Sequence, residues 1–481
     1  MNAEFTSRHA LRLGTMLALA SFTLVPGNAA EQNWPIWRGP LASGAAPDAT
    51  PPLTWSETNH VKWKVKLPGT GSATPIVWGN RVFIQTAIPA GKKAAPASEK
   101  REAAINLSVQ VAGLPQAAPP PPPGEPPPER RRRVPPPGGG FGGGGQKPSE
   151  AHQFLLVCLD RATGKTLWQK VAREEVPHEG HHPTGSFASA SPVTDGQRVV
   201  AFFGSHGLHC YDLNGQLLWE KDLGQMRIKN SFGEGSSPAI FGNTVVVNWD
   251  HEGEDFIVAF ALDTGRELWR TTRTEETSWA TPLVVTHQGK PQVVTSATGK
   301  IRSYDLATGK LLWECRGMTA NAIPSPVAQD GLVYCISGFR GNALLAIRLG
   351  RTGDLTDTDA IAWRHNKSTP YVPSPLLYAG KIYFFSNNNG LISCFSAKDG
   401  QPLFEAERVE ALPNVYASPV GAAGRVYLVG RNGATVVLKQ SDKFEVLATN
   451  RLEDGFDASP ALAGRDLFLR GHEHLYCLAE P

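Results

Sequence analysis

Residues 281–313 of the 481-residue chain read TPLVVTHQGKPQVVTSATGKIRSYDLATGKLLW, and the fold can be predicted from this segment. A Thr-Pro pair opens a short apolar run, and turns at Gly289 and Gly299 separate it from two further runs of alternating apolar and polar residues. A last turn, ATGK, leads into LLW, which ends at Trp313. Alternation with a period of two is typical of strands, and glycine supplies the positive φ that tight turns need. The stretch therefore predicts four consecutive antiparallel strands.

The same pattern recurs along the chain, and each copy opens with Ser or Thr before a proline. These markers stand at Pro75, Pro192, Pro238, Pro282, Pro326, Pro375, Pro419 and Pro460. Successive markers lie 41–49 residues apart, except that 117 residues separate the first two. A period of about 45 residues is that of a four-stranded propeller blade. We therefore expect an all-β fold, an eight-bladed β-propeller of four-stranded antiparallel blades.

A second recurring feature is a D-x-x-T-G-x-x-L-W hairpin, whose Trp we interpret as a packing residue between blades. Variants of it end at Trp168, Trp219, Trp269, Trp313 and Trp363. The last unit stops after three strands, whereas residues 61–67, VKWKVKL, precede the first marker and carry Trp63 in the repeated position. We expect this N-terminal strand to complete the last blade and close the ring. An open solenoid is the alternative, but it requires capping repeats that are not evident.

Two segments stand apart from the repeats. Residues 1–30 have a basic start, an apolar run and a small-residue exit, as in a secretory signal peptide, so we expect export to the periplasm or the extracellular space. Residues 88–152 contain 15 Pro and 10 Gly and are expected to be a disordered insertion within blade 1, because they cannot bury enough apolar surface. Residues 31–60 form an N-terminal extension, and the propeller spans 61–481.

The charge of the chain belongs to these two segments. The net charge is +3, to which residues 1–30 contribute +1 and residues 88–152 contribute +4, so the remainder carries −2. A nearly neutral ring excludes a nucleic-acid-binding protein, and only the insertion is a candidate docking site for an anionic partner. After the signal no segment reaches 18 unbroken apolar residues, which predicts no transmembrane segment in the mature chain. Four of the six cysteines share one repeated position and are interpreted as buried strand residues, namely Cys158, Cys210, Cys394 and Cys477.

The hairpins LDRATGKTLW, YDLNGQLLW, YDLATGKLLW and ALDTGRELW resemble the repeat of pyrroloquinoline-quinone-type (PQQ-like) β-propellers. The N-terminal sequences NWPIWRGP and ATPIVWGNRVFIQTA are similar to those of exported members of that family. The resemblance covers nearly all of the mature chain except residues 88–152. It implies the fold and leaves the activity open, because the repeat also builds non-catalytic propellers, such as the accessory lipoprotein of the outer-membrane β-barrel assembly machine.

Quinoprotein dehydrogenases of this kind stack the quinone between a Trp and a disulfide of adjacent cysteines, and hold calcium with Glu, Asn and Asp. This sequence has no adjacent Cys pair. The loops that enter the blades nevertheless offer candidates for binding PQQ and calcium, namely Glu234, Trp279, Asn321, Asn414 and Asp457. The other interpretation is that these residues satisfy loop backbone groups or line a water-filled funnel.

The densest polar cluster is the histidine-rich sequence HEGHH in the loop that enters the second blade. Together with one histidine from the same face it offers ligands for Zn²⁺ or Cu²⁺, namely His178, His181, His182 and His206. The spacing H-x-x-H-H is not a recognised metal site by itself, and histidines in loops also pack and form hydrogen bonds.

We expect an exported, non-catalytic binding or scaffold module without a cofactor. Its loop-rich face would take a protein, a peptide or a small molecule, because the central funnel of a propeller is a concave pocket. The alternative is a PQQ-dependent dehydrogenase-like oxidoreductase. A third class is a metal-dependent activity at the histidine cluster.

Overall fold

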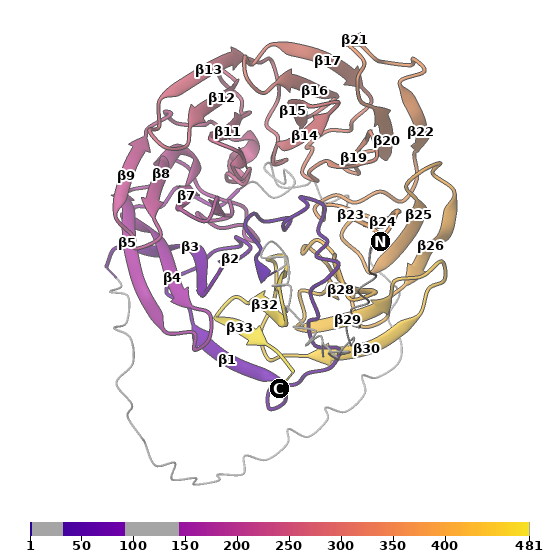
Figure 1. Cartoon of the computed structure of the whole chain (residues 1–481). Coiled ribbons are helices and arrows are strands. Elements are labelled where there is room, and N and C mark those ends of the chain that lie inside the picture. Colours follow the sequence, from indigo (N-terminus) through magenta and orange to yellow (C-terminus); the bar gives the residue numbers. More distant parts are fainter. Residues whose placement is uncertain (2–31, 92–143, 481) are drawn as a thin grey trace, which may run out of the picture.

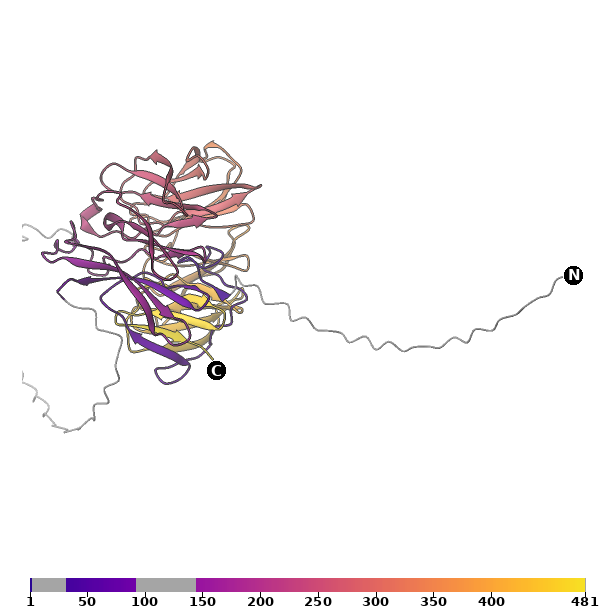
Figure 2. The same cartoon turned by 60° about the vertical axis from the view of Figure 1, so that its left-hand side comes forward.

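The computed structural model describes residue 1 and residues 32–91 and 144–480, and the strands in this part of the chain form eight sheets around one ring (Figure 1). Each sheet is one blade, with its first strand at the centre of the ring and its last strand at the rim. After a turn of 60° the blades are seen to pack side by side around the ring (Figure 2). The expected all-β, eight-bladed propeller is confirmed.

The strands of the blades have the following bounds. Blades 1 to 4 comprise β2 (Ile76–Trp78), β3 (Arg81–Pro89), β4 (His152–Asp160), β5 (Thr166–Glu175); β6 (Val193–Thr194), β7 (Arg198–Phe202), β8 (Leu208–Asp212), β9 (Leu217–Lys221); β10 (Ala239–Phe241), β11 (Thr244–Trp249), β12 (Phe256–Ala261), β13 (Glu267–Thr272); and β14 (Leu283–His287), β15 (Lys290–Ser296), β16 (Lys300–Asp305), β17 (Leu311–Arg316). Blades 5 to 8 comprise β18 (Val327–Gln329), β19 (Leu332–Ser337), β20 (Ala343–Arg348), β22 (Ile361–His365); β23 (Leu376–Tyr378), β24 (Lys381–Phe385), β25 (Leu391–Ser396), β26 (Pro402–Arg408); β27 (Val420–Ala422), β28 (Arg425–Val429), β29 (Ala434–Lys439), β30 (Val446–Arg451); and β31 (Ala461–Ala463), β32 (Asp466–Arg470), β33 (His474–Leu478), β1 (Val61–Lys66).

This connectivity gives the ring two different faces. The loops between the second and third strands of each blade and the loops that lead to the next blade lie at one end, which we call the loop face. The short turns between the first two strands and between the last two strands lie at the other end, which we call the turn face. Two 3₁₀ turns, Gly204–His206 and Lys229–Ser231, lie in loops of the loop face.

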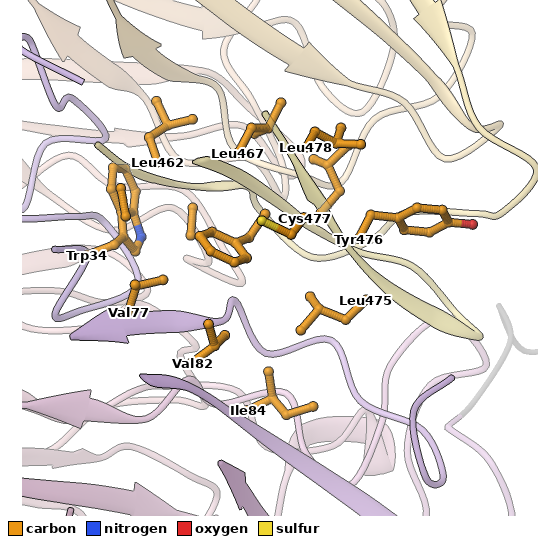
Figure 3. Packing of buried hydrophobic residues seen from close by; sticks show 14 of the residues in the cluster. Trp34, Val77, Val82, Ile84, Leu462, Leu467, Leu475, Tyr476, Cys477 and Leu478 are labelled. Carbon is orange, nitrogen blue, oxygen red and sulfur yellow. The ribbon is translucent and has the colours of Figure 1, made fainter. Parts of the chain in front are cut away.

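The ring closes between blade 8 and blade 1. β1 pairs antiparallel with β33, and Trp63 lies opposite Cys477, so the N-terminal strand is the rim strand of the last blade. Side chains of blade 8 such as Leu467 and Leu475 share one buried cluster with Val82 of blade 1 (Figure 3). The expected closure by the N-terminal strand is confirmed, and the open solenoid is not the arrangement.

The repeated Trp residues lie at the boundaries between blades. The indole of Trp219 in blade 2 donates a hydrogen bond of 2.9 Å to the carbonyl of Leu262 in blade 3, and the ring covers the turn glycine Gly265 at φ +68°. A Cβ on that glycine would lie 2.7 Å from the indole, so the position requires glycine. Equivalent bonds to the following blade join Trp63 to Arg161, Trp168 to Leu213, Trp269 to Leu306, and Trp363 to Ala397.

Blade 4 departs from the four-stranded pattern because a fifth strand lies on its rim. β21 (Gly353–Asp354) comes from the long connection between the last two strands of blade 5 and pairs parallel with β17. In the other blades this connection is short, except in blade 8, whose last two strands come from opposite ends of the chain. The long connection explains why Trp313 differs from its equivalents: its indole donates 3.1 Å to Gln292 Oε1 within its own blade.

Two turn glycines of blade 4 separate the effect of Trp packing from that of backbone strain. Gly309 has φ +71°, and a Cβ there would lie 2.4 Å from the indole of Trp269, whereas Gly289 has φ +74° and open space around it. We expect Gly309→Ala to lower the free energy of unfolding by about 2–4 kcal/mol, and Gly289→Ala to cost only the strain of a positive φ, about 1–2 kcal/mol. Denaturant unfolding of both variants measures the difference. Equal losses would show that the indole adapts to the extra methyl group.

Residues 32–60, the expected N-terminal extension, form an ordered segment that crosses the centre of the ring (Figure 1). The carbonyl of Pro35 accepts a hydrogen bond from Thr194 in blade 2, and that of Ser43 accepts one from Leu377 in blade 6. Farther along, Trp55 stacks on Tyr427 of blade 7 with 6.5 Å between ring centroids. Most of these contacts are to first strands and their turns, so the segment covers the turn-face end of the central channel.

The ends of the insertion expected over residues 88–152 are ordered. β3 continues to Pro89, β4 begins at His152, and Ile88 is buried in the core, so the expected disorder is wrong at these residues. Gly144 and Gly145 donate backbone hydrogen bonds on the loop face. Residues 92–143 and 2–31, the remainder of the insertion and the expected signal peptide, lie outside the described residues. Within the described ranges, no helix is long and apolar enough to cross a membrane.

Candidate functional site

The channel along the ring axis contains a cavity of about 310 Å³ that is reached from the loop face. All eight marker hydroxyl residues line it, and we call this set the hydroxyl belt: Thr74, Ser191, Ser237, Thr281, Ser325, Ser374, Ser418 and Ser459. They surround the channel because each marker immediately precedes the first, innermost strand of its blade. The Ser/Thr-Pro marker found in the sequence is therefore the wall of the candidate site.

Hydrogen bonds join the belt residues from blade to blade. The backbone N–H of Ser374 donates to Ser418 Oγ, and that of Ser418 donates to Ser459 Oγ, each over 2.9 Å. Five further bonds of this kind, of 2.9–3.1 Å, join the preceding belt residues in order from Thr74. Seven of the eight hydroxyl oxygens, all but that of Thr74, thus satisfy a backbone donor that β-pairing leaves free at the start of a blade.

Aromatic side chains form the upper wall and the floor of the cavity. Phe232, Trp279, Tyr371 and Tyr416 line it from the loop face, and Trp37 of the N-terminal extension lines it from the other end. The indole N–H of Trp279 donates 2.7 Å to the carbonyl of Gly233, which fixes the ring in the wall. A ligand in this cavity meets apolar ring surface above and below a belt of hydroxyl groups.

A buried ion pair supports the loop that carries Trp279. Arg273 binds both carboxylate oxygens of Asp250, at 2.7 and 3.0 Å, and both side chains are fully buried. The same carboxylate accepts a 2.6 Å hydrogen bond from Ser278 Oγ, and Ser278 is the residue before Trp279. The network therefore ties the loop that carries Trp279 to a buried ion pair, and removing one member of that pair would leave a buried charge.

Asp457 lines the mouth of the cavity, and its carboxylate is bound by protein groups. Arg431 Nε lies 2.5 Å from one oxygen, and His472 Nε2 lies 2.9 Å from the other. Burial by itself would raise the pKa of Asp457, but the hydrogen bonds and charges of these two partners hold it below its ordinary value. Asp457 in turn raises the pKa of His472 through their hydrogen bond. The Arg431 guanidinium also lies 4.3 Å from the ring centre of Tyr416, so one cation orders two wall residues.

Glu234 lines the main cavity and a smaller one of about 40 Å³ beside it, between blades 2 and 3. Its carboxylate accepts hydrogen bonds from the backbone N–H and the hydroxyl of Ser205, at 2.6 and 2.5 Å. Burial dominates over these bonds and raises the pKa of Glu234 to about 7. This carboxyl group therefore changes its charge near neutral pH.

The structure brings together three of the five residues considered for PQQ and calcium. Glu234, Trp279 and Asp457 line the cavity. Asn321 is buried outside its lining, and Asn414 is exposed. The oxygens of Glu234 and Asp457 already accept protein hydrogen bonds, so the set falls short of the several converging oxygen ligands that a calcium ion takes.

The histidines considered as metal ligands point to separate partners. His178 Nε2 lies 2.6 Å from the carbonyl of Met226, and His182 Nδ1 lies 2.7 Å from Thr184 Oγ1. His206 Nδ1 lies 2.5 Å from Glu175, and His181 Nδ1 lies 2.8 Å from the carbonyl of the next residue. Among residues 32–91 and 144–480, no group of three or more His, Cys, Asp or Glu is placed to hold a metal ion.

All six cysteines are buried and unpaired, as the repeated position of four of them had indicated. Burial raises the pKa of Cys158 and Cys210 to about 12, which keeps both thiols protonated. They pack within strands away from the channel and contribute no reactive group to the cavity.

Three parts of the site were not recognised in the sequence. The belt was visible as the Ser/Thr-Pro marker, but its position on the channel wall was not inferred. Trp37 stands in the NWPIWRGP sequence, and nothing in an extension of unknown course placed it in the cavity. The buried residues Arg38 and Arg470, which contact the backbone beside the belt, had no local signal either.

Comparisons with known proteins agree with this fold. The family model described as outer membrane protein assembly factor BamB matches residues 152–405 and 253–480. Among solved structures, the chain is similar to a europium-containing methanol dehydrogenase, with 9% identity over 94% of this chain and 98% of that chain and a TM-score of 0.57. Quinohemoprotein alcohol dehydrogenase from Comamonas testosteroni has 10% identity over 94% of this chain and 81% of that chain, with a TM-score of 0.57.

A third solved structure is BamB from Moraxella catarrhalis, with 15% identity over 68% of this chain and 93% of that chain and a TM-score of 0.48. At these identities the likeness to solved structures shows the fold alone. No curated protein sequence matches the chain.

Proposed function

The chain belongs to the family described as outer membrane protein assembly factor BamB, and we propose that it is an exported, non-catalytic propeller that acts as a binding or scaffold module. Its ligand, a peptide segment or a small molecule, enters the channel from the loop face. The observation that carries this proposal is the cavity of about 310 Å³ with a fixed aromatic wall. Concave sites with apolar walls and a few placed polar groups are typical of binding sites.

The state of the polar groups supports binding rather than catalysis. Asp457 is held by Arg431 and His472, and the two oxygens of Glu234 are held by Ser205. A general base needs a carboxylate that is free to take a proton from a substrate in the site. Here the carboxylates are held by protein groups, and most of the cavity lining consists of aromatic rings and hydroxyl-bearing side chains.

A capture experiment with matched variants tests the proposal. We immobilise the wild type, Trp279→Ala and Phe241→Ala, and compare what each retains from a periplasmic extract. Phe241 is an exposed aromatic residue at a turn-face hairpin, so its removal leaves the channel intact. We expect the retained component to be lost on Trp279→Ala alone, because aromatic contacts contribute much of the binding free energy at such sites.

The oxidoreductase alternative is tested on the same preparations. PQQ and Ca²⁺ are added to the purified wild type, and dye reduction is followed with alcohols and sugars. We expect no reduction above that of the protein without PQQ. Dye reduction that is lost in the Trp279→Ala variant would overturn the non-catalytic proposal and support the dehydrogenase-like alternative.

A further inference from the structure

The hydroxyl belt presents hydrogen-bond donors to the channel. Each belt residue is more than nine-tenths buried, and seven of the oxygens accept a backbone N–H, as described above. Within the described ranges, none of the eight hydroxyl protons is donated to a protein acceptor. A buried hydroxyl proton without an acceptor is costly, so the channel favours an occupant rich in acceptor oxygens.

Two buried guanidinium groups give the belt a positive surrounding. Arg38 donates to the carbonyls of Pro375 and Pro419, at 2.6 and 3.1 Å, and these prolines directly follow belt residues Ser374 and Ser418. Its Nε atom is buried and has no partner. Between blades 8 and 1, Arg470 donates to the carbonyl of Ala73, which directly precedes a belt residue.

Neither guanidinium has a carboxylate partner within the described part of the chain, and their hydrogen bonds go to backbone carbonyls. Burial lowers the pKa of both Arg38 and Arg470 to about 9, so both are cationic at neutral pH. A buried charge of this kind is stabilised by a nearby anion.

The other ionisable groups that line the cavity do not cancel this effect. Asp457 is paired with Arg431 and His472, which together carry at least as much positive charge. Glu234 is hydrogen-bonded to Ser205 and loses its charge below about pH 7. Apart from the two tyrosines, His182 is the remaining acid or base in the lining. The belt level of the channel is therefore a site for negative charge.

We propose that the channel binds an organic carboxylate, with the carboxylate oxygens on the hydroxyl belt and the apolar body against the aromatic wall. This inference rests on the proposed binding function and names its ligand class. Ser374 and Ser418 are the central donors, because Arg38 contacts the backbone beside both. The apolar body contacts Trp37 on one side and Trp279 on the other.

Benzoate is the probe, and its neutral isostere benzamide is the reference ligand. Binding is measured by calorimetry and by the fluorescence of the two lining tryptophans. We expect benzoate to bind at least about tenfold more tightly than benzamide, since hydrogen bonds to a charged group are stronger than those to a neutral one. Benzoate that binds no more tightly than benzamide would overturn the proposal.

The belt is tested by a double variant, Ser374→Ala/Ser418→Ala, with Ser374→Thr/Ser418→Thr as the rescue. Threonine keeps the hydroxyl and stands naturally at two belt positions, Thr74 and Thr281. We expect the alanine variant to lose about tenfold or more in affinity for benzoate while its affinity for benzamide stays within about twofold. The threonine variant should restore the preference for benzoate.

Ser296→Ala is the matched control, because this hydroxyl is buried, lacks a hydrogen-bond partner and lies outside the cavity lining. If the alanine double variant does not fold, two other measurements test the proposal. They are the benzoate affinity of the threonine variant compared with that of the wild type, and the ratio of the wild-type affinities for benzoate and benzamide. Absence of a benzoate preference while Trp279-dependent capture persists would refute the carboxylate inference and leave the proposed binding function standing. Loss of both would refute both.

Discussion

A chain that begins at Leu67 is expected to lose the single cooperative unfolding transition of the propeller. Such a chain lacks β1, so blade 8 keeps three strands and β33 becomes an unpaired edge beside blade 1. It also lacks Trp63, whose indole donates 2.9 Å to the carbonyl of Arg161 in blade 1. Truncation of one buried Trp costs about 3–5 kcal/mol by itself, and here a whole strand is lost as well.

The same truncation removes the extension across the turn face. Trp34, which pairs with Val77 and is fully buried, and Arg38, which bridges blades 6 and 7, are both lost. We therefore expect a loss of more than about 5 kcal/mol and self-association through the exposed edge of β33. Calorimetry and sedimentation measure the two effects.

The reference is a chain that begins at Glu31, and a synthetic peptide of residues 31–66 is the complementation control. Added to the truncated chain, the peptide should restore one cooperative transition, because strand pairing with β33 supplies the missing fourth strand. A truncated chain that unfolds like the reference would show that closure depends on contacts between β2 and β31 alone.

The fold was predictable because its signals are local and repeated eight times. The Ser/Thr-Pro marker, the turn glycines and the hairpin Trp each reflect one structural need, and their periodicity reveals the blade. The closing strand was predictable for the same reason, since Trp63 occupies the repeated position. By contrast, β21 comes from a connection that follows no repeat, and its position on the rim of blade 4 depends on a tertiary contact.

The site was only partly predictable, because it is formed by residues that converge from many blades. Position before a marker placed Glu234, Trp279 and Asp457 at the channel, but the same rule also selected Asn321 and Asn414, which lie outside the lining. The three lining residues stand two or three positions before the belt residue of their blade, whereas the two asparagines stand four positions before it. The course of residues 32–60 is set by contacts with four or more blades, so no sequence pattern placed Trp37 in the cavity or Arg38 beside the belt.

The substitution Glu234→Gln is expected to stabilise the protein at alkaline pH. The difference in free energy of unfolding between the variant and the wild type is expected to depend on pH. Burial raises the pKa of Glu234 from an ordinary value of 4.5 to about 7. A raised acid pKa means that the folded state prefers the protonated form, so this contribution to stability is present below pH 4.5 and is lost as pH rises through about 7. The loss amounts to roughly 3 kcal/mol for a pKa raised from 4.5 to about 7. Glutamine remains neutral, so the variant avoids it.

In the wild type, the titration of His206 offsets this loss of stability over part of the pH range. Its ring is stacked on Phe154, and burial lowers the pKa of His206 from 6.5 to about 4. A lowered histidine pKa means that stability is present above pH 6.5 and is lost as pH falls toward 4. Between pH 4.5 and 6.5 the two groups change stability in opposite directions, so the wild-type profile is flatter than either contribution.

The difference between variant and wild type isolates the carboxyl group. We measure urea unfolding of both proteins from pH 4.5 to 8 and expect the free-energy difference, variant minus wild type, to grow by roughly 3 kcal/mol over this range. Glu254→Gln is the control, since this glutamate is exposed on a loop of the same blade. A constant difference for Glu234→Gln would mean that folding does not raise the pKa of this carboxyl group, and at neutral pH the channel would then carry a negative charge beside the hydroxyl belt.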